Sequence, residues 1–447
     1  MERTVGVLAV LTLFTKRQLA LTCTLCIGMG ETVAIDIGVF LPLLSAEGQG
    51  QAGESVAAAR RAEELGFESV WAGGHLTGCV PMLDPTVTLA MAAAATTRVK
   101  VGYGVLTVPV HPVAHLAQQL QSLQFLSEGR LLVGADTGGS AWAQWRGGSA
   151  DSPVWAAAGV PYEERHERTD QVLEQLRSLL VAVPAEVGDA AGLALRPRVN
   201  WPPFLIGGES DADLRRAVRH GAWFPNLASP AYVARVLSRL ARLGAESGRV
   251  VRPAVSVAVP STLLAPGTRA RREPPAPTVL RRYGIDAERA SAMPVDGTPE
   301  RAAEKIVEFA RAGVDRLVLS FPETDWRTQY ELAAQAAELA RRELPVRRTA
   351  TAGNQTGCGG WARVTLDLER EPAAYAFLNS LGTDVLDASL ATALEEGVRE
   401  ALAGEARTVR VHRAWVHEVD ANEWVFREAG RRAVTEALAA ERAGGQP

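Results

Sequence analysis

The chain alternates between short apolar segments and helical segments through residues 34–345, and this alternation constrains the fold more than any other feature. One unit is representative. The apolar run Val99–Val105 leads into a helical stretch over residues 112–127, and the apolar run Leu131–Ala135 follows. Parallel strands need a crossover of this kind, which is usually a helix. The remaining predicted strands are Ala34–Leu41, Phe67–Trp71, Pro203–Ile206, Ala222–Pro225, Pro253–Val259 and Arg316–Phe321.

These strand–helix units predict an α/β fold, a (β/α)8 TIM barrel with insertions, because such a barrel needs about 250 residues before insertions are added. A doubly wound open sheet is the alternative. Two loop-rich stretches interrupt the pattern, residues 139–160 and residues 260–296. We expect these insertions to form a lid over one end of the barrel and to set the substrate.

The character of the chain changes after residue 345. We predict a polar linker over residues 346–355 and a separate α+β domain over residues 356–447. This domain is expected to contain the strands Trp361–Leu368 and Thr408–Val416 and the helices Ser389–Leu402 and Glu423–Leu438.

At the other end of the chain, residues 1–33 contain two apolar runs separated by a polar stretch. Neither run reaches the roughly 20 residues that are needed to span a bilayer. We interpret residues 1–33 as a poorly ordered leader or a mis-assigned start. A secretory signal or membrane anchor is the alternative.

The composition argues against several classes of function. The formal net charge of −4 gives no excess of basic residues that would predict binding to nucleic acid or to a membrane surface. Cys23 and Cys26 form one CxxC pair, but no second pair completes a zinc site. No HExxH, facial-triad, G-x-S-x-G or P-loop pattern occurs in the sequence. We therefore expect a cytoplasmic protein without a metal centre.

Chemistry is expected where the predicted strands end, because the C-terminal ends of barrel strands converge at one face. Those ends are Gly74-His75, Tyr103-Gly104-Val105, Asp136-Thr137-Gly138-Gly139, Gly207-Gly208-Glu209-Ser210 and Phe321-Pro322-Glu323. Glycine permits the close approach of backbone to a ligand. The stretch 207–210 also precedes a helix, whose N–H groups and dipole suit a phosphate, although a plain helix cap is the alternative.

His75 is the only histidine at a predicted strand end. On its own it suits an acid–base or cofactor contact as well as it suits a structural hydrogen bond. Asp136 is a carboxylate at a strand end, and the same two interpretations apply to it.

Seven segments between Ile35 and Pro322 resemble those of the luciferase-like flavin-dependent oxidoreductases in order and spacing. They are Ile37–Pro42, Gly66–Trp71 leading to His75, Val101–Val105 through Pro109 to His111-Pro112, Leu126–Leu131, Gly159–Arg165, Leu205–Gly208 and Gly297–Glu300. Members of this family are TIM barrels that bind reduced FMN or the deazaflavin coenzyme F-420 at the C-terminal face. The resemblance implies the same fold and cofactor class, and leaves the choice between FMN and F-420 open.

The resemblance also assigns roles by position. His75 matches the histidine near the reactive face of the ring and is the expected catalytic residue. Gly104 and Val105 match a bulge, often a non-proline cis peptide, that supports the ring from one side. Contacts to the phosphate and side chain of the cofactor are expected at Thr137, Gly138, Gly207, Gly208, Glu209 and Ser210.

Three positions depart from the family pattern. Gly74 replaces an acidic residue that often precedes the histidine, and Gln124 replaces a usual Asp. Asp136 stands where glycine or another small residue is common. A negative charge there is unfavourable near a phosphate, so we expect its side chain to point away or to contact the substrate.

The C-terminal residues resemble domain IV of elongation factor G and of the ribosomal-protection proteins. The resemblance rests on Trp361–Glu369, Ala393–Leu402 and His417–Asp420. No GTP-binding motif accompanies them, so GTPase activity is not implied. An accessory module that packs on the barrel or mediates assembly is the preferred interpretation over contact with RNA or the ribosome.

Together these features imply a flavin-dependent oxidoreductase, a luciferase-like monooxygenase that acts on a small organic substrate with reduced FMN or F-420. Reduced FMN would activate oxygen, or the deazaflavin would pass a hydride. The expected partners are that substrate, a flavin reductase that supplies reduced cofactor, and a second copy of the chain. The alternative is a non-catalytic flavin-binding or scaffold protein with a ribosome- or RNA-contacting C-terminal module.

Overall fold

The structure is a computed structural model, and its residues fall into two compact units, one of residues 34–344 and one that contains residues 345–447. The predicted leader, residues 1–33, lies outside the described residues, as do residues 139–152 and 268–290 of the two insertions. The structure describes residues 35–42, 53–74, 83–138, 153–181, 195–225, 227–247, 252–265, 267, 291–321, 325–344, 346–353, 361–368, 375–379, 386–416 and 421–444.

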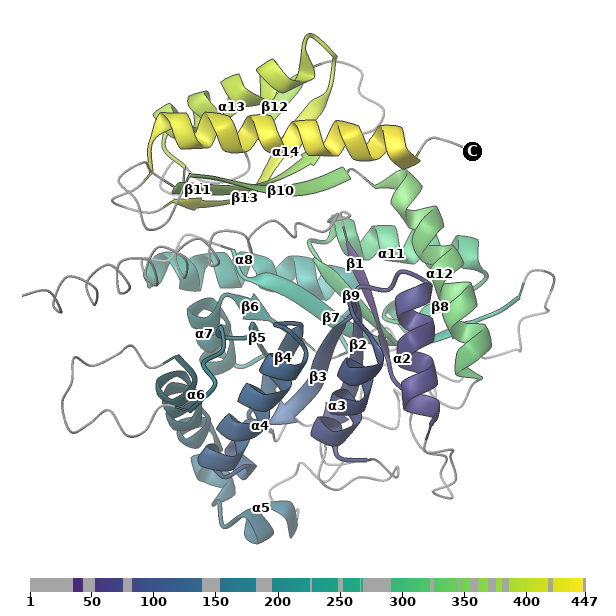
Figure 1. The fold of residues 1–447 in the computed structure, drawn as a ribbon, viewed down its shortest axis with the longest axis vertical. Coiled ribbons are helices and arrows are strands. Elements are labelled where there is room, and N and C mark those ends of the chain that lie inside the picture. Colours follow the sequence, from purple (N-terminus) through teal and green to yellow (C-terminus); the bar gives the residue numbers. More distant parts are fainter. Residues whose placement is uncertain are drawn as a thin grey trace, which may run out of the picture. The chain divides into compact units, whose positions relative to one another are not determined.

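A closed barrel of parallel strands forms the first unit (Figure 1). Strands β1 to β7 pair in chain order, and β9 pairs with both β7 and β1. Each described strand of the ring therefore pairs with two neighbours. The strands are β1 (Asp36–Phe40), β2 (Ser69–Gly74), β3 (Lys100–Thr107), β4 (Leu131–Asp136), β5 (Phe204–Ile206), β6 (Ala222–Trp223), β7 (Ala254–Leu263) and β9 (Arg316–Ser320). The predicted TIM barrel is confirmed, and the open sheet is excluded.

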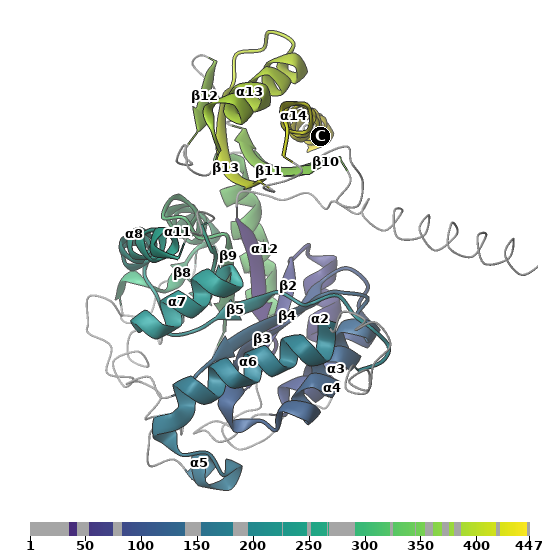
Figure 2. The same ribbon diagram turned by 90° about the vertical axis from the view of Figure 1, so that its left-hand side faces the viewer.

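Helices cover the outside of the strands (Figures 1 and 2). They are α2 (Glu54–Glu64), α3 (Pro85–Ala95), α4 (Val113–Leu126), α6 (Arg165–Val181), α7 (Asp211–His220), α8 (Pro230–Glu246), α11 (Pro299–Arg311) and α12 (Trp326–Glu343), with the short helices η1 (Val108–Val110), α5 (Pro153–Ala158) and η3 (Tyr162–Glu164). Their ends follow local chemistry. Asp84 caps α3 by accepting from the Val87 N–H, and Gly66 ends α2 at a φ of 78°.

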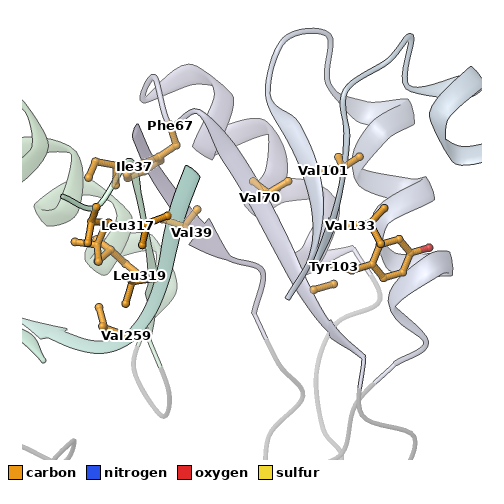
Figure 3. Close-up of a cluster of buried hydrophobic side chains, with 14 of the residues drawn as sticks. Ile37, Val39, Phe67, Val70, Val101, Tyr103, Val133, Val259, Leu317 and Leu319 are labelled. Carbon is orange, nitrogen blue, oxygen red and sulfur yellow. The ribbon is translucent and has the colours of Figure 1, made fainter. Parts of the chain in front are cut away.

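The main core lies between the strands and this outer layer. Val70, Val101 and Val133 point outward from the successive strands β2, β3 and β4 and are inaccessible to water (Figure 3). Because each barrel strand is buried on both faces, its sequence is an almost continuous apolar run. This is why the strands could be located from the sequence.

A second apolar cluster fills the barrel interior. Trp71 and Phe224 lie at its centre with ring centroids 5.1 Å apart, and the Trp71 Nε1–H donates to Ser69 Oγ at 2.8 Å. Glycine makes room for them, since a Cβ atom at Gly102 would lie 2.5 Å from the Trp71 ring. The interior of the barrel is therefore filled with side chains, and a ligand can bind only at one of its mouths.

A cluster of partly buried charges lies at the N-terminal mouth. Arg316 donates to Glu68 through Nε at 2.8 Å and through Nη2 at 2.6 Å, and Lys100 pairs with the same carboxylate. Burial, and then the charge of Glu68, raise the pKa of Asp36 to about 6. Charges at this end of a barrel usually serve stability, so the C-terminal mouth remains for chemistry.

The second unit is an α+β domain with its own apolar core. Its sheet has the strand order β10 (Val346–Gly353), β11 (Trp361–Leu368), β13 (Thr408–Val416) and β12 (Ala376–Asn379), and only the β12–β13 pair is parallel. Helices α13 (Ala388–Leu402) and α14 (Glu423–Gly444) cover one face of this sheet (Figure 1). The two helices pack closely where a Cβ atom at Gly430 would lie 2.7 Å from the Leu394 carbonyl oxygen.

Three short strands differ from the sequence prediction. The stretch predicted as a linker, residues 346–355, forms β10 over Val346–Gly353 and pairs antiparallel with β11. Two residues of β10 that are buried, Ala350 and Ala352, are small and gave no apolar signal. Neither β12 nor β8 (Val295–Gly297), which pairs with the end of β7 outside the ring, was predicted.

Candidate active site

The residues at the C-terminal mouth can be assigned by strand alternation. Leu132 on β4 and Leu205 on β5 both belong to the interior cluster. Because successive side chains point to opposite faces, Asp136 and Gly207 also point inward, at the rim of the mouth. Their proximity agrees with this assignment, since a Cβ atom at Gly207 would lie 3.3 Å from the Asp136 Cβ.

One side of the mouth is a bulge in β3. The pairing of β3 with β4 shifts register between Tyr103 and Leu106, and the Gly104–Val105 peptide is cis. Val105 belongs to the interior cluster, so the bulge lies on the inner surface. It is tightly packed from behind, because a Cβ atom at Gly104 would lie 2.8 Å from Phe40 Cζ. The cis peptide stands at the position where the family resemblance implied it.

A second glycine supports the same bulge. A Cβ atom at Gly74, the last residue of β2, would lie 2.7 Å from the Val105 carbonyl oxygen. Gly74 was noted above as a departure from the family pattern. Its packing supplies a structural reason for glycine, because any side chain here would push against the bulge.

The segment after β4 is held on both sides. Thr137 is buried, and its hydroxyl donates to Asp213 Oδ1 at 3.0 Å. Gly138 has a φ of 75°, and a Cβ atom there would lie 3.1 Å from the ring of Trp155 on α5. The predicted contact residues Thr137 and Gly138 are therefore fixed between α7 and the part of the first insertion that the structure describes.

The segment after β5 is a helix cap. The Ser210 Oγ accepts from the Asp213 N–H at 3.2 Å and donates to Asp213 Oδ2 at 2.6 Å, while the Ser210 N–H donates to that same oxygen. This reciprocal pattern is a capping box. Gly208, at a φ of 90°, lies directly against the Asp213 carboxylate. The chain's own groups thus satisfy two of the N–H groups at the start of α7, those of Ser210 and Asp213.

Asp213 is joined to a buried cation. Arg216, which is 2% exposed, donates to Asp213 Oδ1 at 2.9 Å and to both oxygens of Asp170 on α6 at 2.9 and 3.0 Å. Nδ1 of His166 lies 3.8 Å from Asp213 Oδ1. Burial lowers the pKa of His166 despite the charge of Asp213, so this imidazole favours its neutral form.

The sequence analysis did not identify Asp213, Asp170 or Arg216. The spacing of Ser210 and Asp213 is a capping-box signal that was present in the sequence. The partnership of Arg216 with Asp170 had no such signal, because it joins α6 to α7 across the fold.

Asp136 faces this network from β4. Burial, and then the negative charge of Asp213, raise the pKa of Asp136 to about 6. The backbone N–H groups of Gly138 and Thr137 interact with its carboxylate and oppose the rise, as does the charge of Arg216. The mouth between β4 and β5 therefore holds two carboxylates, Asp136 on its surface and Asp213 behind it.

Comparison with known proteins decides the family. The family model described as luciferase-like monooxygenase matches residues 35–316, which is more than half of the chain. This chain belongs to the luciferase-like monooxygenase family. The match ends before the second unit and so gives no support to the resemblance of that unit to elongation factor G, which stays a prediction.

Relatives in sequence cover only part of this chain. An uncharacterized protein of Mycobacterium tuberculosis is 32% identical over 174 residues, which are 38% of this chain and 57% of that protein. The chain therefore spans little more than half the length of this relative.

Two solved structures share the fold of the first unit. One is an F-420-dependent secondary alcohol dehydrogenase in complex with an F-420–acetone adduct, which is 17% identical and has a TM-score of 0.53 over 68% of this chain and 99% of that chain. The other is the oxygenating constituent of 3,6-diketocamphane monooxygenase from Pseudomonas putida in complex with FMN, a type II Baeyer–Villiger monooxygenase. It is also 17% identical, with a TM-score of 0.53 over 69% of this chain and 97% of that chain.

The two sides of the C-terminal mouth of the barrel suit different chemical groups. On the side of Gly104 and Val105, the peptide lies over an apolar interior and Gly104 has no side chain, which suits a flat ring. The side between β4 and β5 carries Asp136 and Asp213, and Arg216 beside them is already paired with Asp170. A ring fits the first side, whereas a doubly charged phosphate does not fit the second.

The predicted catalytic residue, His75, lies outside the described residues, as do Gly139, Pro322 and Glu323. Strand β2 ends at Gly74, so the described chain stops at the mouth immediately before His75. The role of His75 stays a prediction. In the part of the chain that is described, no helix is long and apolar enough to cross a membrane.

Proposed function

We propose that this protein is a flavin-dependent oxidoreductase that binds the ring of reduced FMN or coenzyme F-420 on the Gly104–Val105 bulge and oxidises or reduces a small organic substrate. The observation that carries the proposal is the bulge itself. It lies on the inner surface of the C-terminal mouth. Gly104 packs against Phe40 and Gly74 packs against the Val105 carbonyl oxygen, so closely that neither position has room for a side chain. The fold is shared with one protein that binds F-420 and one that binds FMN.

When bound, the reduced cofactor would supply either electrons for the activation of oxygen or a hydride. The chain's own contribution begins with exclusion of water. Trp71, Phe224 and Val105 form the floor of the mouth and are 0%, 1% and 7% exposed. A dry floor strengthens every electrostatic interaction above it and keeps bulk water from the reacting atoms.

The first insertion contributes a wall. Trp155 on α5 is 4% exposed, packs edge-on against Tyr162 and lies against Gly138 at the rim. This position supports the expectation that the insertion covers the mouth. His75, the next residue after β2, is proposed as the proton donor, because a positioned imidazole can donate and accept protons near neutral pH.

Cofactor binding and turnover test this proposal together. The purified protein is titrated with FMN and with F-420, and candidate substrates are then assayed with each cofactor in its reduced form. We expect one cofactor to bind and to support turnover. A protein that binds neither and turns over nothing with either one would contradict the proposal.

His75→Ala tests the proton donor. Loss of a positioned acid–base group typically costs 100-fold or more, so we expect turnover to fall by about that factor with little change in cofactor affinity. His115→Ala is the matched control, because His115 is exposed on α4. Turnover that is unchanged in His75→Ala would remove this residue from the mechanism.

The alternative is a non-catalytic flavin-binding or scaffold protein. The acidic side of the mouth favours it, because Asp136 stands where the family resemblance implied a small residue beside the cofactor. Cofactor binding without any turnover, in wild type and in His75→Ala alike, is the result that this alternative predicts.

A further inference from the structure

The proposed function leaves Asp136, at the rim of the mouth, without a role. It points into the mouth from the last position of β4, one step from the predicted contact residues Thr137 and Gly138. Across the rim it lies against Gly207, the first of the predicted contact residues after β5. Any cofactor tail that runs from the bulge toward these residues must pass its carboxylate.

Two sets of backbone N–H donors near the rim face a carboxylate of this chain. Those of Thr137 and Gly138 interact with Asp136. At the start of α7, the Ser210 N–H donates to Asp213 Oδ2, and Ser210 Oγ occupies the Asp213 N–H. A phosphate at the helix N-terminus would have to displace these partners to use the Ser210 or Asp213 N–H, and it would lie beside the Asp213 carboxylate.

Among the described residues, the cation that binds Asp213 does not compensate for the two carboxylates. Arg216 is the buried cation of this network, and its guanidinium already binds Asp213 and Asp170. Asp211, in the first turn of α7, adds a third carboxylate near the rim, although its exposed side chain pairs with Arg239. A dianion at this rim would therefore meet an excess of negative charge at low dielectric.

We infer that Asp136 is a specificity-determining residue that makes this mouth discriminate against a phosphomonoester dianion, and so against FMN in favour of a cofactor whose tail has a single charge or none there. The inference rests on the proposed function and names its cofactor class. F-420 carries a phosphodiester, with one negative charge, at the position where FMN carries a phosphomonoester. Riboflavin has the same ring as FMN and no phosphate, so this pair isolates the effect of the phosphate.

The test is equilibrium binding of riboflavin, FMN and F-420 to wild type, Asp136→Asn and Asp136→Gly, followed by flavin fluorescence. We expect wild type to bind FMN no more tightly than riboflavin. Asp136→Asn should tighten FMN binding at least fivefold and change riboflavin binding less than twofold. Asp136→Gly removes the whole side chain and should tighten FMN binding by at least the same factor. It does so even if the Asn side chain still accepts from the Thr137 and Gly138 N–H groups. Thermal unfolding reports whether each variant is folded.

Asp211→Asn is the matched control. It removes one negative charge as Asp136→Asn does, but from an exposed ion pair in the first turn of α7, and should change FMN binding less than twofold. The inference is overturned if wild type binds FMN at least fivefold more tightly than riboflavin, or if neither Asp136 variant reaches a fivefold gain. If no variant and no wild-type sample binds any of the three cofactors, the proposed function fails and the inference fails with it.

Discussion

Arg130 has a structural role, although it belongs to a segment that resembles the luciferase-like family. It lies in this stretch, Leu126–Leu131, yet it stands just before β4, at the opposite end of that strand from the mouth. Its guanidinium donates to the carbonyl oxygens of Ala93 and Thr96 at 2.8 and 3.0 Å, which closes the C-terminal end of α3. The segment therefore fixes a helix end and says little about catalysis.

The departure at Gln124 has a similar explanation. Its Nε2 donates to the Asn200 carbonyl at 3.1 Å, and its Oε1 accepts from the Leu131 N–H at 3.2 Å. A carboxylate could accept but not donate, so this pair of bonds needs an amide. Gln124 lies on α4 and contacts the first residue of β4, at the end of that strand opposite the mouth. The departure at this position therefore does not weaken the case for catalysis.

Glu63 gives a pH-dependent prediction. Its Oε2 accepts from the backbone N–H groups of Thr97, Arg98 and Val99 at 3.0, 2.5 and 2.8 Å, which fixes the turn before β3. Partial burial alone would raise the pKa of Glu63, but these three N–H groups outweigh it and lower the pKa. Because the folded pKa lies below the unfolded one, the stabilisation is present above pH 4.5 and is lost as the pH falls below it.

We therefore expect Glu63→Gln to lower the free energy of unfolding at pH 7 by about 1–2 kcal/mol, since bonds to a charged acceptor are lost. The difference from wild type should shrink as the pH falls below 4.5. Urea unfolding at a series of pH values measures it, with the exposed neighbour Glu64→Gln as the control. A difference that grows toward low pH would contradict the assigned sign.

At the scale of elements, the barrel strands were predictable because burial on both faces makes them apolar throughout. The strands that were missed lack this property. In β10 the buried residues Ala350 and Ala352 stand among arginines and threonines in the sequence, and β8 has only three residues, one of them Asp296. The bulge at Gly104 was placed by family resemblance, whereas the bonds of Asp213 to Thr137 and Arg216 depend on how α7 meets β4 and could not be read from spacing.

The interior packing makes a prediction about one strand. A Cβ atom at Gly102 would lie 2.5 Å from the Trp71 ring, and Trp71 is fully buried and also packs against Phe224. We expect Gly102→Ala to destabilise the barrel by about 1–3 kcal/mol, as overpacking usually does. Gly53→Ala is the control, because nothing lies within 4 Å of a Cβ atom there. Equal midpoints in urea for the two variants would show that the interior is not so tightly filled.

At the scale of the whole molecule, the chain has two separate hydrophobic cores. The barrel clusters and the cluster of the second unit share no buried residue among those described. Units with separate cores usually unfold separately. The family match covers only the first of them, so the proposed activity is assigned to residues 34–344.

Calorimetry tests this independence. We expect two unfolding transitions in the full chain, and one in a chain that ends at Leu344, at nearly the temperature of the corresponding transition in the full protein. The shortened chain should also keep its affinity for the cofactor. A single transition in the full chain, together with loss of binding on truncation, would mean that the second unit belongs to the site.

The central claim is that the Gly104–Val105 bulge supports the ring of the cofactor, and one measurement tests it directly. The affinity of whichever cofactor binds, FMN or F-420, is compared among wild type, Gly104→Ala and the control Gly53→Ala. A Cβ atom at Gly104 would lie 2.8 Å from Phe40 Cζ and must displace either the bulge or the ring behind it. We predict that Gly104→Ala stays folded and binds the cofactor at least tenfold more weakly, while Gly53→Ala binds as wild type does. A folded Gly104→Ala protein with wild-type affinity would contradict the claim.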